Sequence, residues 1–102
     1  MRIMDNCYTL KGIVFVWDQD KAGKNTVKHD GVSFEQAAEA FFDPFLRIMD
    51  ASSNKETREA IIGRDKQWNL LFVVHLLIEE NDVVRIISAR KATRTEREFY
   101  EN

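Results

Sequence analysis

The order of the expected helices and strands predicts an α+β domain. A strand comes first, two helices follow it, and four further strands precede a final helix. Short turns between the last four strands favour antiparallel hairpins, and so a four-stranded antiparallel meander with the helices segregated from it. A chain of 102 residues is long enough for one domain with one core. We expect the helices to cover one face of the sheet and to leave the other face free to bind a ligand.

The first expected strand follows a stretch with little pattern. Residues 1–12 predict either a loose arm or an edge strand, ahead of a single domain over residues 13–102. Ile13 to Trp17 is a run of β-branched and aromatic residues, which is typical of a strand.

The first helix is expected to run from Gln19 to about Lys28, capped by Asp18 and stopped by the Asp-Gly pair at residues 30–31. Its only large apolar residue is Val27. At about 100° per residue, one arc of this helix gathers five polar residues. They are Asp18, Lys21, Asn25, Lys28 and His29. This polar stripe is either a solvated face or the wall of a site.

The second helix has the pattern of an ordinary core helix. Ser33 and Gln36 have the spacing of a capping box at its start. Its apolar residues recur at helical spacing and are expected in the core; they are Phe34, Ala37, Ala38 and Phe41. The Asp-Pro pair at residues 43–44 ends it.

Four strands and a helix complete the chain. The strands are expected at Phe45 to Met49, Arg58 to Gly63, Leu70 to Ile78 and Val83 to Arg90. Turn residues separate them at 52–55, 65–69 and 80–81. The last helix is expected to start at Thr93, which has capping-box spacing to Glu96.

Composition narrows the possible classes of protein. The formal net charge of −2 argues mildly against a non-specific nucleic-acid binder. Cys7 is the single cysteine, so no internal disulfide is possible and a reducing compartment fits. One cysteine and two distant histidines lack metal-ligand spacing, so neither a metal nor another cofactor is expected. The apolar run over residues 70–78 is too short to span a membrane, and no signal-peptide pattern is visible, which predicts a cytoplasmic protein.

Positive charge is concentrated near the C-terminus, in Arg85, Arg90, Lys91, Arg94 and Arg97. Arg85 and Arg90 are five residues apart, so on a regular strand their side chains point to opposite faces. They can serve one site only if a bulge intervenes or if Arg90 lies beyond the end of the strand.

The length of the last hairpin loop decides how these residues pair. A two-residue turn at 80–81 would place Leu76 opposite Arg85. His75, Ser88 and Arg90 would then share one face, whereas a loop one residue longer would reverse this assignment. The sequence does not decide between the two registers, and His75 within an apolar strand also fits a plain core histidine.

Short runs spread along the chain carry a resemblance to a known family. They are Phe15-Val16-Trp17-Asp18, Lys21, Asn25, Lys28-His29, Gly31-Val32-Ser33-Phe34-Glu35, Arg58, Ile62-Gly63, Val73-Val74-His75, Arg85-Ile86-Ile87-Ser88-Ala89-Arg90, Ala92-Thr93, Glu96-Arg97 and Tyr100. With these runs in this order, the chain resembles the BrnT family, the toxin half of BrnT/BrnA toxin–antitoxin pairs, over about residues 13–102. It departs from the family pattern at Asp30, which stands between His29 and Gly31 where the family usually runs His-Gly directly.

The resemblance implies a small RelE-like fold and a bacterial, cytoplasmic endoribonuclease toxin that cleaves RNA without a metal. It also implies neutralisation by a BrnA-like ribbon-helix-helix antitoxin in a toxin–antitoxin hetero-oligomer. Operator DNA would be bound only through the antitoxin.

Such an activity gives roles to the polar residues singled out above. We expect Arg58, Arg85 and Arg90 to bind the phosphate and stabilise the transition state, because guanidinium groups match phosphate oxygens and stay charged. The candidates for proton transfer or orientation are His29, Lys21 and Tyr100. The candidates for binding the RNA strand are Arg97, Lys28, Asn25 and Trp17, the last by stacking on a base, although Trp17 equally fits the core.

A second class of function fits the same residues. A non-catalytic protein-binding module, such as an inactive toxin homologue, would use the same basic surface to bind an acidic partner. A DNA-binding domain fits less well, because no helix-turn-helix pair presents a basic recognition helix.

Overall fold

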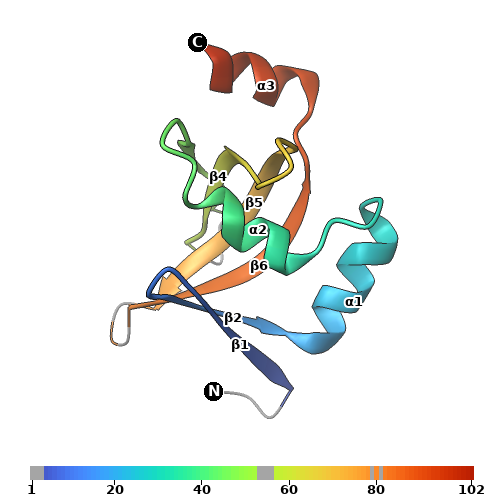
Figure 1. Cartoon of the computed structure of the whole chain (residues 1–102), viewed down its shortest axis with the longest axis vertical. Coiled ribbons are helices and arrows are strands. Elements are labelled where there is room, and N and C mark those ends of the chain that lie inside the picture. The colour runs from blue at the N-terminus through green and yellow to red at the C-terminus, as the bar shows by residue number, and fades with distance from the viewer. Residues whose placement is uncertain (1–3, 53–56, 79, 81) are drawn as a thin grey trace.

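The computed structural model describes residues 4–52, 57–78, 80 and 82–102. Within these residues the chain forms a mixed sheet of six strands, in the order β1-β2-β6-β5-β4-β3, together with three helices (Figure 1). The strands are β1 (Asp5–Leu10), β2 (Ile13–Asp18), β3 (Arg47–Asp50), β4 (Glu59–Arg64), β5 (Leu70–Ile78) and β6 (Val83–Lys91). The helices are α1 (Gln19–Lys28), α2 (Phe34–Ala40) and α3 (Arg94–Glu101). The α+β class predicted from the sequence is confirmed.

The last four strands pair antiparallel in sequence order, as predicted, but the prediction that they form the whole sheet is wrong, because the sheet has six strands and is mixed. Residues 5–10 form the edge strand β1, which pairs antiparallel with β2. β2 in turn runs parallel to β6, with Phe15 opposite Val84. Parallel pairing joins segments that lie far apart in the chain, so no short turn in the sequence indicates it.

The helix starts follow the predicted caps. The Asp18 carboxylate accepts hydrogen bonds from the N–H groups of residues 20 and 21, and both capping boxes, Ser33 with Gln36 and Thr93 with Glu96, are formed. The third strand starts at Arg47 instead of Phe45. The predicted turns at 52–55 and 80–81 fall partly on residues 53–55 and 81, outside the described residues.

The core lies between the sheet and the first two helices. Figure 1 shows α2 crossing one face of the sheet, with α1 beside it. Phe15, Phe34 and Leu71 are fully buried there. The sheet approaches α2 so closely at Gly63 that a Cβ on this residue would lie 2.5 Å from the carbonyl oxygen of Ala40. The residue at this position must therefore be glycine for α2 to pack as it does.

The third helix lies on the opposite face, so the prediction that all helices share one face holds only for α1 and α2. Arg47, Ile62, Phe72 and Arg90 form one row across β3, β4, β5 and β6. Residues directly opposite each other share a face of the sheet. The Phe99 ring of α3 lies 4.6 Å from the Arg47 guanidinium, and Glu96 of α3 binds Arg90. α3 therefore covers one end of this second face.

His75 belongs to the core face and not to the face of the arginines. It is 5% exposed and its ring packs against Phe41. Its Nε2 lies 3.4 Å from the Glu59 carboxylate, and its Nδ1 lies 3.5 Å from the carbonyl oxygen of Val73. Burial lowers the pKa of His75 below its ordinary value, although Val73 and Glu59 act in the opposite direction.

This lowered pKa predicts that stability falls with acidity below neutrality. Because the unfolded chain takes up a proton near pH 6.5 and the folded chain resists it, the free energy of unfolding should decrease as the pH drops from about 7 to 5. Although burial acts to raise them, the pKa values of Asp43, Asp65 and Glu96 are lowered as well, by hydrogen bonds. However, the ordinary pKa values of these carboxyl groups, 3.8 to 4.5, place their loss of stability at lower pH. Urea unfolding across pH 5–7 should show a flatter pH dependence for His75→Gln than for the wild type. Equal slopes would contradict this account of His75.

Candidate functional site

A bulge in β6 places Arg85, Ser88 and Arg90 on one face of the sheet. Leu76 lies opposite Arg85 and Phe72 lies opposite Arg90, while the register shifts between Val74 and its neighbour in β5. Ile87 is the extra residue, because Val74 pairs with residue 88 and the next residue of β5 pairs with residue 86. The pairing of Leu76 with Arg85 is the one expected for a two-residue turn, but the bulge reverses the side on which Ser88 and Arg90 lie.

Arg58 directly precedes β4. Glu59, the first residue of β4, points to the core side, where it reaches His75, so the same alternation continued by one residue assigns Arg58 to the other side. Arg58 and Leu76 line the same surface hollow. We call this side of the sheet, opposite α1 and α2, the arginine face, after Arg58, Arg85 and Arg90.

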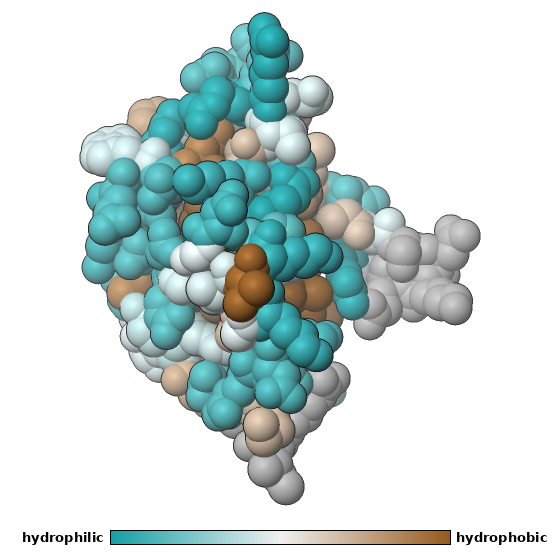
Figure 2. All heavy atoms as spheres, turned by 90° about the vertical axis from the view of Figure 1, so that its right-hand side faces the viewer, coloured by the Kyte–Doolittle hydropathy of each residue, from teal (hydrophilic) through white to brown (hydrophobic). Residues whose placement is uncertain are grey.

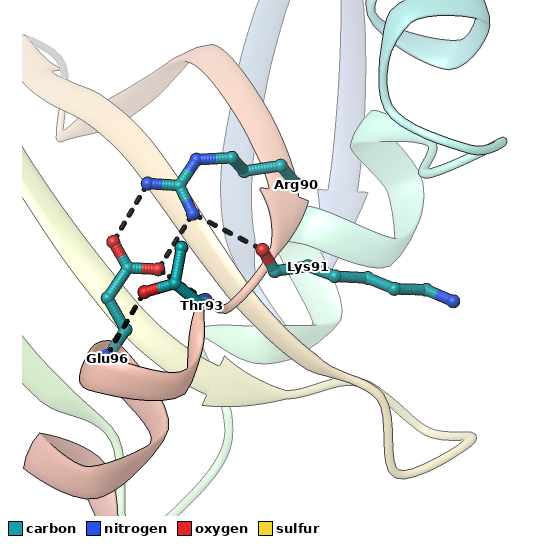
Figure 3. A network of polar contacts seen from close by, with 4 residues as sticks. All are labelled: Arg90, Lys91, Thr93 and Glu96. Atoms are coloured by element: carbon teal, nitrogen blue, oxygen red, sulfur yellow. Dashed lines mark hydrogen bonds and ion pairs between the residues drawn. The ribbon is translucent and has the colours of Figure 1, made fainter.

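Arg90 is held in a fixed orientation at the α3 end of the arginine face (Figure 3). Its Nη1 and Nη2 donate to the two carboxylate oxygens of Glu96 at 2.7 and 2.8 Å. The guanidinium also lies 4.2 Å from the centre of the Phe72 ring, and Nη1 reaches the carbonyl oxygen of Lys91 at 3.3 Å. The hydrogen bond with Glu96 raises the pKa of Arg90 further. A bidentate carboxylate and an aromatic face leave this guanidinium little freedom.

Arg85 is also paired with a carboxylate. Its Nη1 and Nη2 donate to Asp5 of β1 at 3.2 and 2.5 Å. The Arg85 side chain is 14% exposed and that of Asp5 is fully buried. Asp5 and Glu96 were not among the candidate residues from the sequence. The only signal was the capping-box spacing of Glu96, which does not show that its carboxylate also reaches β6.

Asn25 of the polar stripe joins α1 to the sheet. Its Nδ2 donates to the carbonyl oxygens of Val32 and Ala89 at 3.1 and 2.8 Å, and its Oδ1 accepts the N–H of Ala89 at 3.1 Å. β2 pairs with β6 only at residues 83–85. Asn25 therefore satisfies backbone hydrogen bonds of β6 beyond the end of that pairing. At Asn25 the polar stripe is therefore neither solvated nor open to a ligand, because this side chain is used to hold α1 against β6.

The other residues of the stripe flank this contact. Lys21 and His29 lie one helical turn before and after Asn25, so they occupy the side of α1 that meets β6. Lys21 and Lys28 are exposed, and His29 is half-buried at the C-cap. Figure 2 shows the side of the molecule that carries α1, where hydrophilic side chains dominate and hydrophobic ones are scattered.

Two candidates from the sequence have structural contacts instead of open surfaces. Trp17 is 3% exposed, and its ring packs against Tyr8 and Phe34 in the core. The Tyr100 hydroxyl donates to Asp43 at 2.6 Å. Burial raises the pKa of Tyr100, and the hydrogen bond to Asp43 raises it further.

The remaining candidate, Arg97, is exposed on α3. On the arginine face itself, Arg85 and Arg90 are ordered by their carboxylate partners. Arg85 and Arg90 are five residues apart, roughly 15 Å along a strand, so one phosphate group cannot contact both. The arrangement suits an extended polyanion better than a small anion. Among the described residues, no three His, Cys, Asp or Glu side chains gather so that they could hold a metal ion.

The fold and the site thus define a small α+β protein with ordered arginine side chains on one face of its sheet. Residues 17–96 match the family model described as ribonuclease toxin, BrnT, of type II toxin-antitoxin system. The chain therefore belongs to the BrnT family of ribonuclease toxins. No curated protein matches its sequence. In the described parts of the chain, no helix is both long enough and apolar enough to cross a bilayer.

Proposed function

We propose that this protein is an endoribonuclease that cleaves RNA at the arginine face without a metal. The family supplies the general activity, that of a ribonuclease toxin. The observation that supports the location is the register of β6, which directs Arg85 and Arg90 to the same side of the sheet as Arg58.

The proposed chemistry is attack by a neighbouring group within the RNA. The 2′-oxygen forms a bond to the adjacent phosphorus, the bond from phosphorus to the 5′-oxygen breaks, and a 2′,3′-cyclic phosphate and a 5′-hydroxyl result. One proton leaves the 2′-hydroxyl and one is delivered to the departing 5′-oxygen. Arg90 is proposed to stabilise the extra negative charge on the phosphorane, because Glu96 and Phe72 fix its guanidinium in advance.

The remaining residues divide into strand binding and proton transfer. Arg58 and Arg85 are proposed to bind neighbouring phosphates, with Arg97 and Lys28 on the flanks. His29 and Lys21 are the proposed proton-transfer groups, because they flank Asn25, which binds the edge of β6 at Ala89, the residue before Arg90. RNA bound on the arginine face would have to reach them around this edge of β6, beyond its pairing with β2. Asn25, Trp17 and Tyr100 are assigned to structure, because their side chains are already engaged within the fold.

The proposed partner is a BrnA-like ribbon-helix-helix antitoxin encoded by a neighbouring gene, which neutralises the toxin and alone contacts operator DNA. A type II toxin–antitoxin family implies an antitoxin of some kind.

Inducible expression in bacteria tests the activity and the partner together. Induction alone should arrest growth and degrade messenger RNA, and co-expression of the neighbouring gene should restore both. Normal growth with intact messenger RNA after induction of folded protein would exclude the toxin activity. Persistent arrest in the presence of the neighbouring product would exclude that product as the antitoxin.

One observation favours the non-catalytic module. Two guanidinium groups of the arginine face are already matched by the internal carboxylates of Asp5 and Glu96. A face that only binds an acidic protein partner could keep these arginines paired with internal carboxylates, because it needs no guanidinium group free for a reacting phosphate. Such a module would bind its partner and leave RNA intact, so RNA cleavage by the purified protein separates the two functions.

A further inference from the structure

The turn between β4 and β5 carries a tryptophan where glycine is usual. The N–H of Asp65 donates to the carbonyl oxygen of Asn69 at 3.0 Å, and the N–H of Trp68 donates to the carbonyl oxygen of Asp65 at 3.1 Å. This is a tight hairpin loop whose last residue must be left-handed, and Trp68 has φ of +68°. A bulky side chain is disfavoured in that conformation, which glycine adopts freely.

Burial does not compensate for this strain. Trp68 is 76% exposed, so its large apolar ring remains in solvent. The other tryptophan, Trp17, is by contrast 3% exposed. Local strain that the fold does not require is often kept at sites of function.

The surroundings of Trp68 resemble a site for a flat ring with an attached anion. Trp68 lines a cavity of about 220 Å³ together with Lys66, Lys11, Phe42 and Pro44. The Lys11 ammonium lies 5.1 Å from the centre of the Phe42 ring. An exposed aromatic ring beside lysines is the combination with which proteins bind single-stranded nucleic acid.

The charged residues that line the cavity balance one another, so the ring of a ligand should contribute more to binding than its phosphate. Lys11, Arg64 and Lys66 face Glu39, Asp43 and Asp65 among the lining residues. Asp65 accepts hydrogen bonds from the Gln36 and Asn69 side chains and from the turn backbone, so its carboxylate is occupied within the fold. A site without a large positive excess binds through stacking more than through phosphate attraction.

We propose that this cavity binds an unpaired nucleobase, which stacks on Trp68 while Lys66 and Lys11 contact its phosphate. The nucleotide comes either from an RNA strand or from a free mononucleotide. The turn lies at the end of the sheet where Arg90 also lies, because Leu70, just after the turn, bonds to Ala92. The proposal concerns binding alone and does not require RNA cleavage.

Trp68→Gly is the informative variant, because glycine suits the left-handed turn and the fold should be at least as thermally stable as the wild type. Phe45→Ala is the matched control, since Phe45 is 73% exposed and does not line the cavity. The strand is a fluorescein-labelled 2′-O-methyl oligonucleotide, which cannot be cleaved by 2′-hydroxyl attack. Its affinity, measured by anisotropy, should fall roughly 5- to 100-fold in Trp68→Gly and stay unchanged in Phe45→Ala.

Mononucleotide binding is measured through the tryptophan fluorescence of the wild type. AMP should quench it and ribose 5-phosphate should not, which would support a free nucleotide as a sufficient ligand. Loss of strand affinity in Trp68→Gly without quenching by AMP would support the strand as the source. Equal strand affinity of Trp68→Gly and wild type would overturn the proposal. So would an equal loss in Phe45→Ala, or equal quenching by ribose 5-phosphate and AMP.

Discussion

Replacing Arg90 with alanine should reduce the rate of RNA cleavage by about 100- to 1000-fold, the usual loss when one ordered donor to a transition-state oxyanion is removed. The guanidinium is fixed by Glu96 and Phe72 before RNA arrives, so no other side chain can take its place without reorganisation. The rate is measured on purified protein with excess labelled RNA, and circular dichroism confirms that the variant is folded.

Arg94→Ala is the matched control for this prediction. Its side chain is 93% exposed and pairs only loosely with Glu98 at 3.5 Å, one turn further along α3. It removes the same charge from the same region and should leave the cleavage rate within about twofold of the wild type, as expected for an exposed pair. A rate for Arg90→Ala equal to that of Arg94→Ala would remove Arg90 from the proposed site.

Replacing Asn25 with alanine should destabilise the fold by about 3–5 kcal/mol, because each buried polar group left without a partner costs about 1–3 kcal/mol. The change removes three hydrogen bonds, two of them to the backbone of Ala89 in β6. α1 has little apolar surface to compensate, since Val27 is 89% exposed. Urea unfolding monitored by circular dichroism measures the loss.

Thr26→Ala on the same helix provides the comparison. The Thr26 hydroxyl donates to the carbonyl oxygen of Ala22 in an exposed position, so its removal should change stability by about 0.5 kcal/mol or less. Similar stability of Asn25→Ala and Thr26→Ala would show that Asn25 does not hold α1 to the sheet. The structural role of Asn25 would then give way to the RNA-binding role expected from the sequence.

Local signals in the sequence located most of the elements. The caps at Asp18, Ser33 and Thr93 fixed the helix starts, and the apolar run Leu70–Ile78 matched β5. These features depend on residues close together in the chain, whose spacing is visible in the sequence. The parallel pairing of β2 with β6 joins distant segments and leaves no such spacing.

The candidate site was predictable only as far as its residue types. The sequence allowed Arg85 and Arg90 to share a face only if a bulge intervened, and the bulge at Ile87 is a property of the sheet that no single residue announces. The carboxylates of Asp5 and Glu96 come from other elements, so their contacts with these arginines depend on tertiary packing. Trp68 shows the reverse case, because its strained conformation goes against the local preference for glycine.

The most direct test of the central claim, that the arginine face promotes attack by the RNA 2′-hydroxyl, is the end-group analysis of RNA cleaved by the purified protein in EDTA. Cleavage should proceed, give 2′,3′-cyclic phosphate and 5′-hydroxyl ends, and stop when the nucleotide at the cleaved position carries a 2′-deoxy sugar. Cleavage only after addition of Mg²⁺, or undiminished cleavage of the 2′-deoxy substrate, would contradict it.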